Sequence, residues 1–219
     1  MPEAPNATAA RPPIIHPLIV RITHWINAFA MVIMVMSGWK IYDASPIWDF
    51  MFPHWMTLGG WLGGALGWHF AAFWLLIANG TVYVIYGLIS GHFRRNFQPL
   101  SAKEVWRDFT AALAFRLEHR LGTYNAVQKL LYVVVLLMGL GVVLSGFAIW
   151  KPVQFQFLTG LLGGYDTARI VHFAMMAGIV GFALVHLSLV VLVPSTLPPM
   201  FTGRASGPNH HDLHQGAPT

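Results

Sequence analysis

Four long apolar stretches dominate the pattern of hydrophobic and polar positions along the chain. They cover roughly residues 18–42, 68–90, 124–150 and 168–193. A helix needs about 20 predominantly apolar residues to cross a bilayer, and each stretch reaches that length. The pattern therefore predicts four membrane-spanning helices and an all-α fold, an integral membrane four-helix bundle.

Aromatic residues near the ends of these stretches strengthen the prediction. They are Trp39, Tyr42, Trp68, Tyr124, Trp150 and Tyr165, and such residues gather where a span meets the lipid headgroups. The first stretch could be taken for a signal peptide. However, the run Ser37-Gly38-Trp39-Lys40 offers no clear small-residue cleavage site, so we predict a retained first span.

Composition agrees with a single membrane domain. Of the 219 residues, 56% are hydrophobic and 10% are charged, whereas soluble domains carry about 25% charged residues. We predict a cytoplasmic N-terminal tail over residues 1–17, a four-span domain over 18–200 and a disordered cytoplasmic tail over 201–219.

The positions of the basic residues predict the orientation. The segment between the second and third spans holds Arg94, Arg95, Lys103, Arg107, Arg116 and Arg120. By the positive-inside rule, residues 91–123 and both termini are cytoplasmic, and residues 43–67 and 151–167 face outward. Topology thus accounts for the net charge of +5, and we predict no nucleic-acid partner.

The chain contains no cysteine. This excludes disulfides, cysteine-ligated iron–sulfur clusters, thiolate zinc sites and a covalently attached c-type haem. A redox cofactor held by this chain would need other ligands.

Four histidines fall within the predicted spans: His24, His69, His172 and His186. An ionisable residue inside a membrane is a functional hypothesis by default. His172 and His186 are 14 residues apart, which places them on nearly the same helix face with a rise of about 21 Å. Matching depth in the bilayer then pairs His186 with His24 near the inner side, and His172 with His69 near the outer side.

Two opposed imidazoles from different helices are the axial ligands that a six-coordinate haem b needs. The four histidines therefore predict two haems b. A zinc or copper site would want three or four ligands at one depth, and a di-iron site lacks its Glu-x-x-His motif. Small residues such as Ser37-Gly38 and Ser145-Gly146 leave room for a planar cofactor, although they also serve plain helix packing.

Arg21 and Arg169 each precede one of these histidines by three residues, and either could bind a haem propionate. Of the other histidines, His16, His54, His92 and His119 have no assigned role. We assign no catalytic residue.

Three sequence runs resemble a known family. They are residues 20–28 (VRITHWINA), which contain His24-Trp25, and residues 123–129 (TYNAVQK) with residues 145–152 (SGFAIWKP). They resemble the bacterial cytochrome b561 and nickel–iron hydrogenase cytochrome b superfamily, including the cytochrome b subunit of formate dehydrogenase. The stretch 79–95 is similar to members that accompany periplasmic molybdopterin oxidoreductases.

The resemblance implies a subunit of the bacterial inner membrane that carries two haems b and exchanges electrons with menaquinone or ubiquinone. It implies a quinone contact at Asn125, with Gln128 assisting, beside the inner haem. The family motif has glycine where this chain has Val127. The implied partner is a periplasmic redox subunit of the molybdopterin oxidoreductase or hydrogenase type.

We therefore expect a membrane cytochrome b subunit that carries electrons between the quinone pool and a periplasmic oxidoreductase, in either direction. Residues 43–67, with Trp48, Trp55 and Trp61, are the expected docking surface, or else a segment lying in the membrane interface. Two alternatives stay open. One is a stand-alone cytochrome b561 that oxidises quinol with a small-molecule acceptor, so the chain itself could be an enzyme. The other is a non-redox transporter or scaffold.

Overall fold

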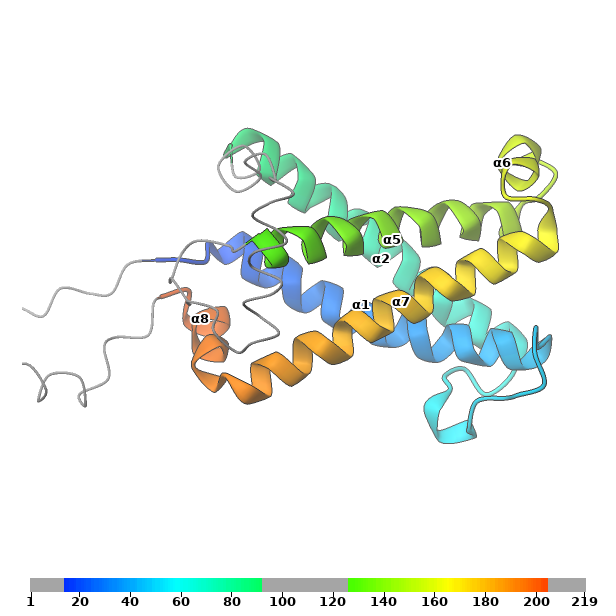
Figure 1. Ribbon diagram of the computed structural model, residues 1–219, viewed down its shortest axis with the longest axis horizontal. Helices are drawn as coiled ribbons and strands as arrows, with labels where there is room; N and C mark the ends of the chain where they lie inside the picture. Colours follow the sequence, from blue (N-terminus) through cyan, green and yellow to red (C-terminus); the bar gives the residue numbers. More distant parts are fainter. Residues whose placement is uncertain (1–13, 92–125, 205–219) are drawn as a thin grey trace, which may run out of the picture.

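The computed structural model of the protein describes residues 14–91 and 126–204 (Figure 1). It contains four long helices: α1 (Leu18–Ala44), α2 (Leu62–Ile89), α5 (Ala126–Trp150) and α7 (Tyr165–Leu192). All four are long and apolar enough to span a membrane, and the described residues include no strand. The prediction of an all-α bundle with four membrane spans is confirmed.

Prolines lie just outside two of the long helices. Pro17 is the residue before α1, and Pro194 lies two residues after the end of α7. Proline lacks the N–H that a helix interior needs, so it is suited to positions outside a helix. The second span begins at Leu62, six residues before the predicted boundary at 68. Gly63, Gly64 and Gly67 belong to this first part of α2, as glycine is common in membrane helices. His69 consequently lies seven residues into α2 rather than at its start.

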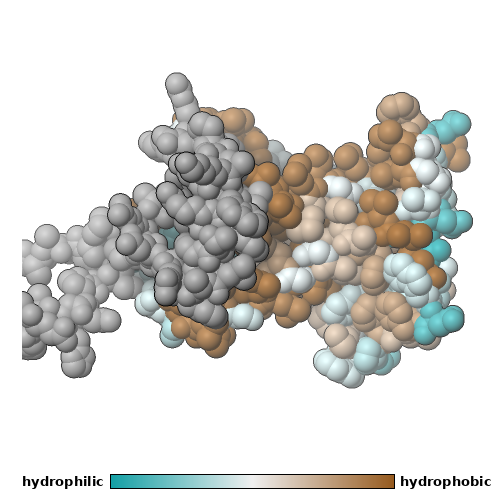
Figure 2. Space-filling model, in the orientation of Figure 1, coloured by the Kyte–Doolittle hydropathy of each residue, from teal (hydrophilic) through white to brown (hydrophobic). Residues whose placement is uncertain are grey.

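The long helices pack as two pairs. Backbones approach closely between α1 and α2 and between α5 and α7, and the described long helices of different pairs approach far less. The buried residues are mostly small: Ala30, Ser37, Ala65, Ala72, Ser145, Ala148 and Ala168. Such residues allow membrane helices to pack closely. Most large apolar side chains are exposed, and they cover much of the visible face as brown surface (Figure 2).

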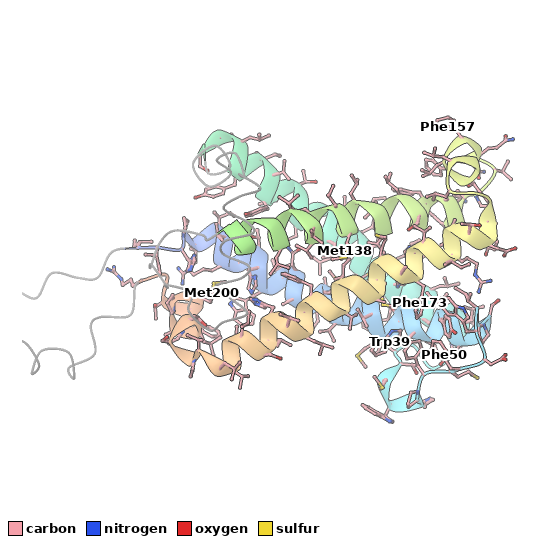
Figure 3. The ribbon with its side chains drawn as sticks, in the orientation of Figure 1. Trp39, Phe50, Met138, Phe157, Phe173 and Met200 are labelled. Carbon is pink, nitrogen blue, oxygen red and sulfur yellow. The ribbon has the colours of Figure 1, made fainter. Side chains whose placement is uncertain are left out.

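One end of the bundle carries the segment 45–61, with the short helix η1 (His54–Met56), and the short helix α6 (Gln156–Leu161). We call it the outer end, after the predicted orientation. Aromatic rings pack there: Trp39 stacks on Phe52, and Phe50 and Phe173 both contact Tyr42. Trp39, Phe50 and Phe173 lie together in Figure 3. The cluster closes the α1–α7 side of the bundle at this end.

The opposite end, called the inner end, brings the two described ends of the chain together. After η2 (Pro194–Thr196), helix α8 (Leu197–Thr202) returns to the start of α1 (Figure 1). The N–H of Ile15 donates to the carbonyl oxygen of Gly203 at 2.8 Å, and Trp25 stacks on Phe201. Helix α8 spans position 200, where the predicted four-span domain ends.

Several predicted features lie outside the described residues. These are the basic loop 92–123 and almost all of the two tails, 1–13 and 205–219.

Candidate functional site

The structure brings the four histidines of the spans together as two pairs. The ring centroids of His24 in α1 and His186 in α7 lie 6.2 Å apart. Those of His69 in α2 and His172 in α7 lie 6.4 Å apart. Helix α7 thus contributes one histidine to each pair, and each pair joins helices from different halves of the bundle.

The positions of the histidines within their helices place each pair at one depth. His69 and His172 each lie seven residues after the first residue of their helix, near the outer end. His24 lies six residues after the start of α1, and His186 six residues before the end of α7. We call these the outer pair and the inner pair.

The spacing of each pair fits one metal ion between two imidazoles. A metal bound by two ring nitrogens at about 2 Å each places the ring centroids about 6 Å apart. The described residues contain no group of three or more His, Cys, Asp or Glu that could hold a metal ion. Two histidines per site suit a metal that is held mainly by a macrocycle and takes two further ligands from the protein. They do not suit a zinc or copper site made of protein ligands alone, which needs three or four.

Glycines border the rings of the outer pair. A Cβ atom at Gly38 would lie 3.4 Å from Cε1 of His69, and one at Gly146 would lie 3.3 Å from Cε1 of His172. Both glycines belong to the helix that packs beside the histidine. Their missing side chains therefore let each ring lie against the neighbouring backbone, a role that small residues play in membrane bundles.

Two serines contact the outer pair, a role beyond the room for a cofactor that their small size predicted. Ser37 Oγ lies 3.1 Å from Nδ1 of His69, and Ser145 Oγ lies 3.2 Å from Nδ1 of His172. Both serines are fully buried. A signal for them exists, because Ser-Gly recurs in the first and third spans and His-Phe-Ala in the second and fourth.

The inner pair has a more aromatic environment. The ring of Phe182, one turn before His186, lies nearly parallel to it at 6.2 Å. His24 meets Trp25 edge-on, and Trp25 Nε1 donates to the carbonyl oxygen of Met200 in α8. Among the described residues, neither histidine has a serine hydroxyl against its ring.

The two arginines predicted to bind propionates contact backbone carbonyls. Arg21 Nη1 donates to Phe201 O in α8, and Arg169 Nη2 donates to Ser45 O and lies 3.3 Å from Ser45 Oγ. Nε of Arg21 is buried, with no hydrogen-bond partner among the described residues. Arg21 therefore retains a donor that an anionic group at the inner end could use.

The remaining residues predicted from the sequence either lie outside the described part of the chain, have no described side chain, or lie apart from both histidine pairs. Asn125 lies outside the described part, as do His92 and His119, and Gln128 belongs to α5 without a described side chain. His54 is exposed in η1, a short helix that contributes no residue to either histidine pair.

Four apolar helices joined by two interhelical histidine pairs define a membrane cytochrome b. The chain belongs to the prokaryotic cytochrome b561 family, which it matches over residues 15–203. This confirms the resemblance seen in the sequence, and membership of the family implies haem b.

One relative matches along almost its whole length. It is the putative protein-methionine-sulfoxide reductase subunit YedZ1 of Azospira oryzae, which is 50% identical over 190 residues. The match covers 86% of this chain and 96% of that protein. No solved structure matches the chain.

Proposed function

We propose that this protein is the electron-transferring cytochrome b subunit of a membrane oxidoreductase complex. The observation that carries the proposal is the presence of two histidine pairs at two depths of one four-helix bundle, each spaced for a single metal ion. A subunit with one redox centre near each membrane face is suited to moving electrons across the membrane.

His24 with His186, and His69 with His172, would hold two haems b, one per histidine pair. When bound, such haems would supply one-electron transfer. The chain itself orients the ligands, because each ring is set by its helix and its neighbours. Arg21 and Arg169 would bind propionates, as guanidinium groups pair well with carboxylates.

The name of the relative suggests the partner. Since 50% identity extends over 96% of a protein named as a reductase subunit, we infer that this chain serves a reductase of protein methionine sulfoxide. The name describes the partner by its substrate, whereas the resemblance described it as the molybdopterin oxidoreductase or hydrogenase type. Converting a sulfoxide to a thioether and water consumes two electrons and two protons, so electrons would flow from the membrane to the partner.

The quinone pool is the proposed electron source. The family resemblance assigns quinone binding to Asn125 and Gln128. Gln128 belongs to α5, and Asn125 immediately precedes the first residue of α5 in the sequence. The start of α5 is at the same end of the bundle as α8 (Figure 1), the end that also holds the inner histidine pair. A quinone there would be next to the inner redox centre and the cytoplasmic proton supply.

The outer end offers a surface for the partner. Trp48, Met51, Trp55 and Trp61 are exposed in the segment 45–61, and exposed aromatic and methionine side chains are enriched at protein interfaces. This segment lies at the end that carries the outer pair, so a docked partner would be close to the outer redox centre.

An absorption spectrum tests the proposal most directly. The dithionite-reduced minus oxidised spectrum of the purified protein should be of the b type, with two haems per chain by quantitation. His69→Ala and His172→Ala should each remove one and the same spectral component and leave the other. Absence of a b-type spectrum would refute the proposal. Loss of different components in the two variants would refute the pairing.

The electron path has its own test. The protein reconstituted with a quinol and its reductase partner should support reduction of methionine sulfoxide in a protein substrate. Asn125→Leu should slow that turnover and leave both haems in place. Turnover that persists without any quinol, with an unchanged rate in Asn125→Leu, would contradict the quinone assignment.

A further inference from the structure

The outer pair is built from a motif that occurs twice. Residues 37–42 of α1 read Ser-Gly-Trp-Lys-Ile-Tyr, and residues 145–150 of α5 read Ser-Gly-Phe-Ala-Ile-Trp. Residues 69–71 of α2 and 172–174 of α7 both read His-Phe-Ala. Since α1 packs on α2 and α5 packs on α7, each helix pair places the same Ser-Gly against the same histidine.

The hydrogen bonds of the serines determine which ring nitrogen carries the proton. Ser37 Oγ lies 2.5 Å from the carbonyl oxygen of Ile33, one turn back in α1, and Ser145 Oγ lies 2.7 Å from that of Gly141. A hydroxyl has one proton and two lone pairs. With that proton donated to the helix carbonyl, each serine oxygen can only accept from Nδ1–H of its histidine.

Each serine hydroxyl also faces a second carbonyl oxygen of its own helix. Ser37 Oγ lies 3.2 Å from Met34 O, and Ser145 Oγ lies 3.2 Å from Val142 O. A carbonyl oxygen only accepts hydrogen bonds, so the hydroxyl proton stays on the helix side and the histidine nitrogen donates. With the proton on Nδ1, the lone pair lies on Nε2, the nitrogen that is left to bind a metal.

We propose that Ser37 and Ser145 are positioning residues for the outer haem, which they also keep at a lower midpoint potential than it would otherwise have. The proposal rests on the proposed function. An acceptor on Nδ1–H fixes the ring orientation and makes Nε2 a stronger electron donor, which favours oxidised iron. The described residues provide no such serine at His24 or His186, so the effect is confined to the outer site.

Redox titration of the intact, haem-loaded protein tests this inference. Ser37→Ala and Ser145→Ala should each shift the midpoint potential of one component to a more positive value, and the double variant should shift it further. That component is the one removed by His69→Ala. The other component should keep its potential, because its histidines do not contact either serine.

Ser188→Ala is the matched control. Ser188 lies in α7 and donates to the carbonyl oxygen of Leu184 at 2.8 Å, the same helix contact that Ser37 and Ser145 make, and no contact with a histidine accompanies it. It should move neither potential. Haem quantitation accompanies each titration, and a loss of haem confined to the outer component in the serine variants also supports the positioning role.

Other outcomes would overturn the inference. They are unchanged potentials in both serine variants with both haems retained, equal shifts of both components, loss of both haems together, or a shift of the component that His69→Ala spares. A wild-type protein without b-type haem would instead refute the proposed function. The two failures are therefore distinguishable.

Discussion

At the scale of single residues, small side chains determine how closely a histidine ring approaches the neighbouring helix. Cε1 of His172 lies 3.3 Å from where a Cβ at Gly146 would stand, and Cε1 of His69 lies 3.4 Å from one at Gly38. The buried serines beside these glycines contact the adjacent ring nitrogen, Nδ1. A well-packed site responds to a single added methyl group, because it cannot relax freely.

We expect Gly146→Ala to lower the haem content of the protein from two per chain toward one. The added methyl presses on the edge of His172 and turns the ring away from the position it shares with His69. Gly139→Ala is the control and should retain both haems, because in the described part of the chain nothing outside its own helical backbone lies within 4 Å of its Cβ position. Equal haem content in the two variants, measured by pyridine haemochrome, would contradict this account.

At the scale of elements, a polar contact joins α1 to α2 within the membrane. Asn79 is buried, and its Nδ2 donates to Thr23 O at 2.8 Å and to Asn27 Oδ1 at 2.6 Å. The contact lies within the helix pair rather than between the pairs. It therefore holds His24 and His69, which belong to different sites, on one rigid unit.

We expect Asn79→Leu to destabilise the bundle by about 0.6–1.7 kcal/mol, the range of interhelical hydrogen bonds measured in a membrane protein. Thermal unfolding in detergent should show a lower Tm. Thr81→Val removes a hydroxyl that bonds only within α2, to Ile77 O at 2.7 Å, and should change Tm less. If Thr81→Val proved the more damaging, the Asn79 contact would not be the one that joins the helices.

At the scale of the whole molecule, the two ends of the bundle differ in chemistry. The outer end carries the exposed tryptophans and the hydrophilic surface visible beside α6 (Figure 2). The inner end carries α8 and the paired ends of the described chain. Because the basic residues between α2 and α5 in the sequence favour the cytoplasm, the predicted orientation places the inner end at the cytoplasmic face and the outer end at the opposite face.

The absence of native cysteine makes this orientation easy to test. Phe157→Cys, at an 86% exposed position of α6, should react with a membrane-impermeant thiol reagent in intact cells or spheroplasts. Thr202→Cys, exposed in α8, should react only after the membrane is permeabilised. The reverse labelling pattern would mean that the positive-inside rule misassigned the topology.

The sequence predicted more of the histidine pairs than of their surroundings. His24, His69, His172 and His186 were identifiable because polar residues are rare in apolar spans, and helix geometry ordered them by depth. The contacts of Ser37 and Ser145 with the histidines were not predicted. A serine in a membrane helix can bond its own backbone, and its contact with a histidine depends on the register of a second helix.

By itself, the sequence determined the four apolar spans, the lack of thiolate chemistry and the four histidines available as ligands, because length, hydropathy and residue type are local properties. Only the tertiary structure decided which helices pair, where α2 begins, and that two buried serines and two glycines shape the outer site. Those features depend on how one helix surface meets another. That fit is set by side chains far apart in the chain, and no single stretch of sequence contains it.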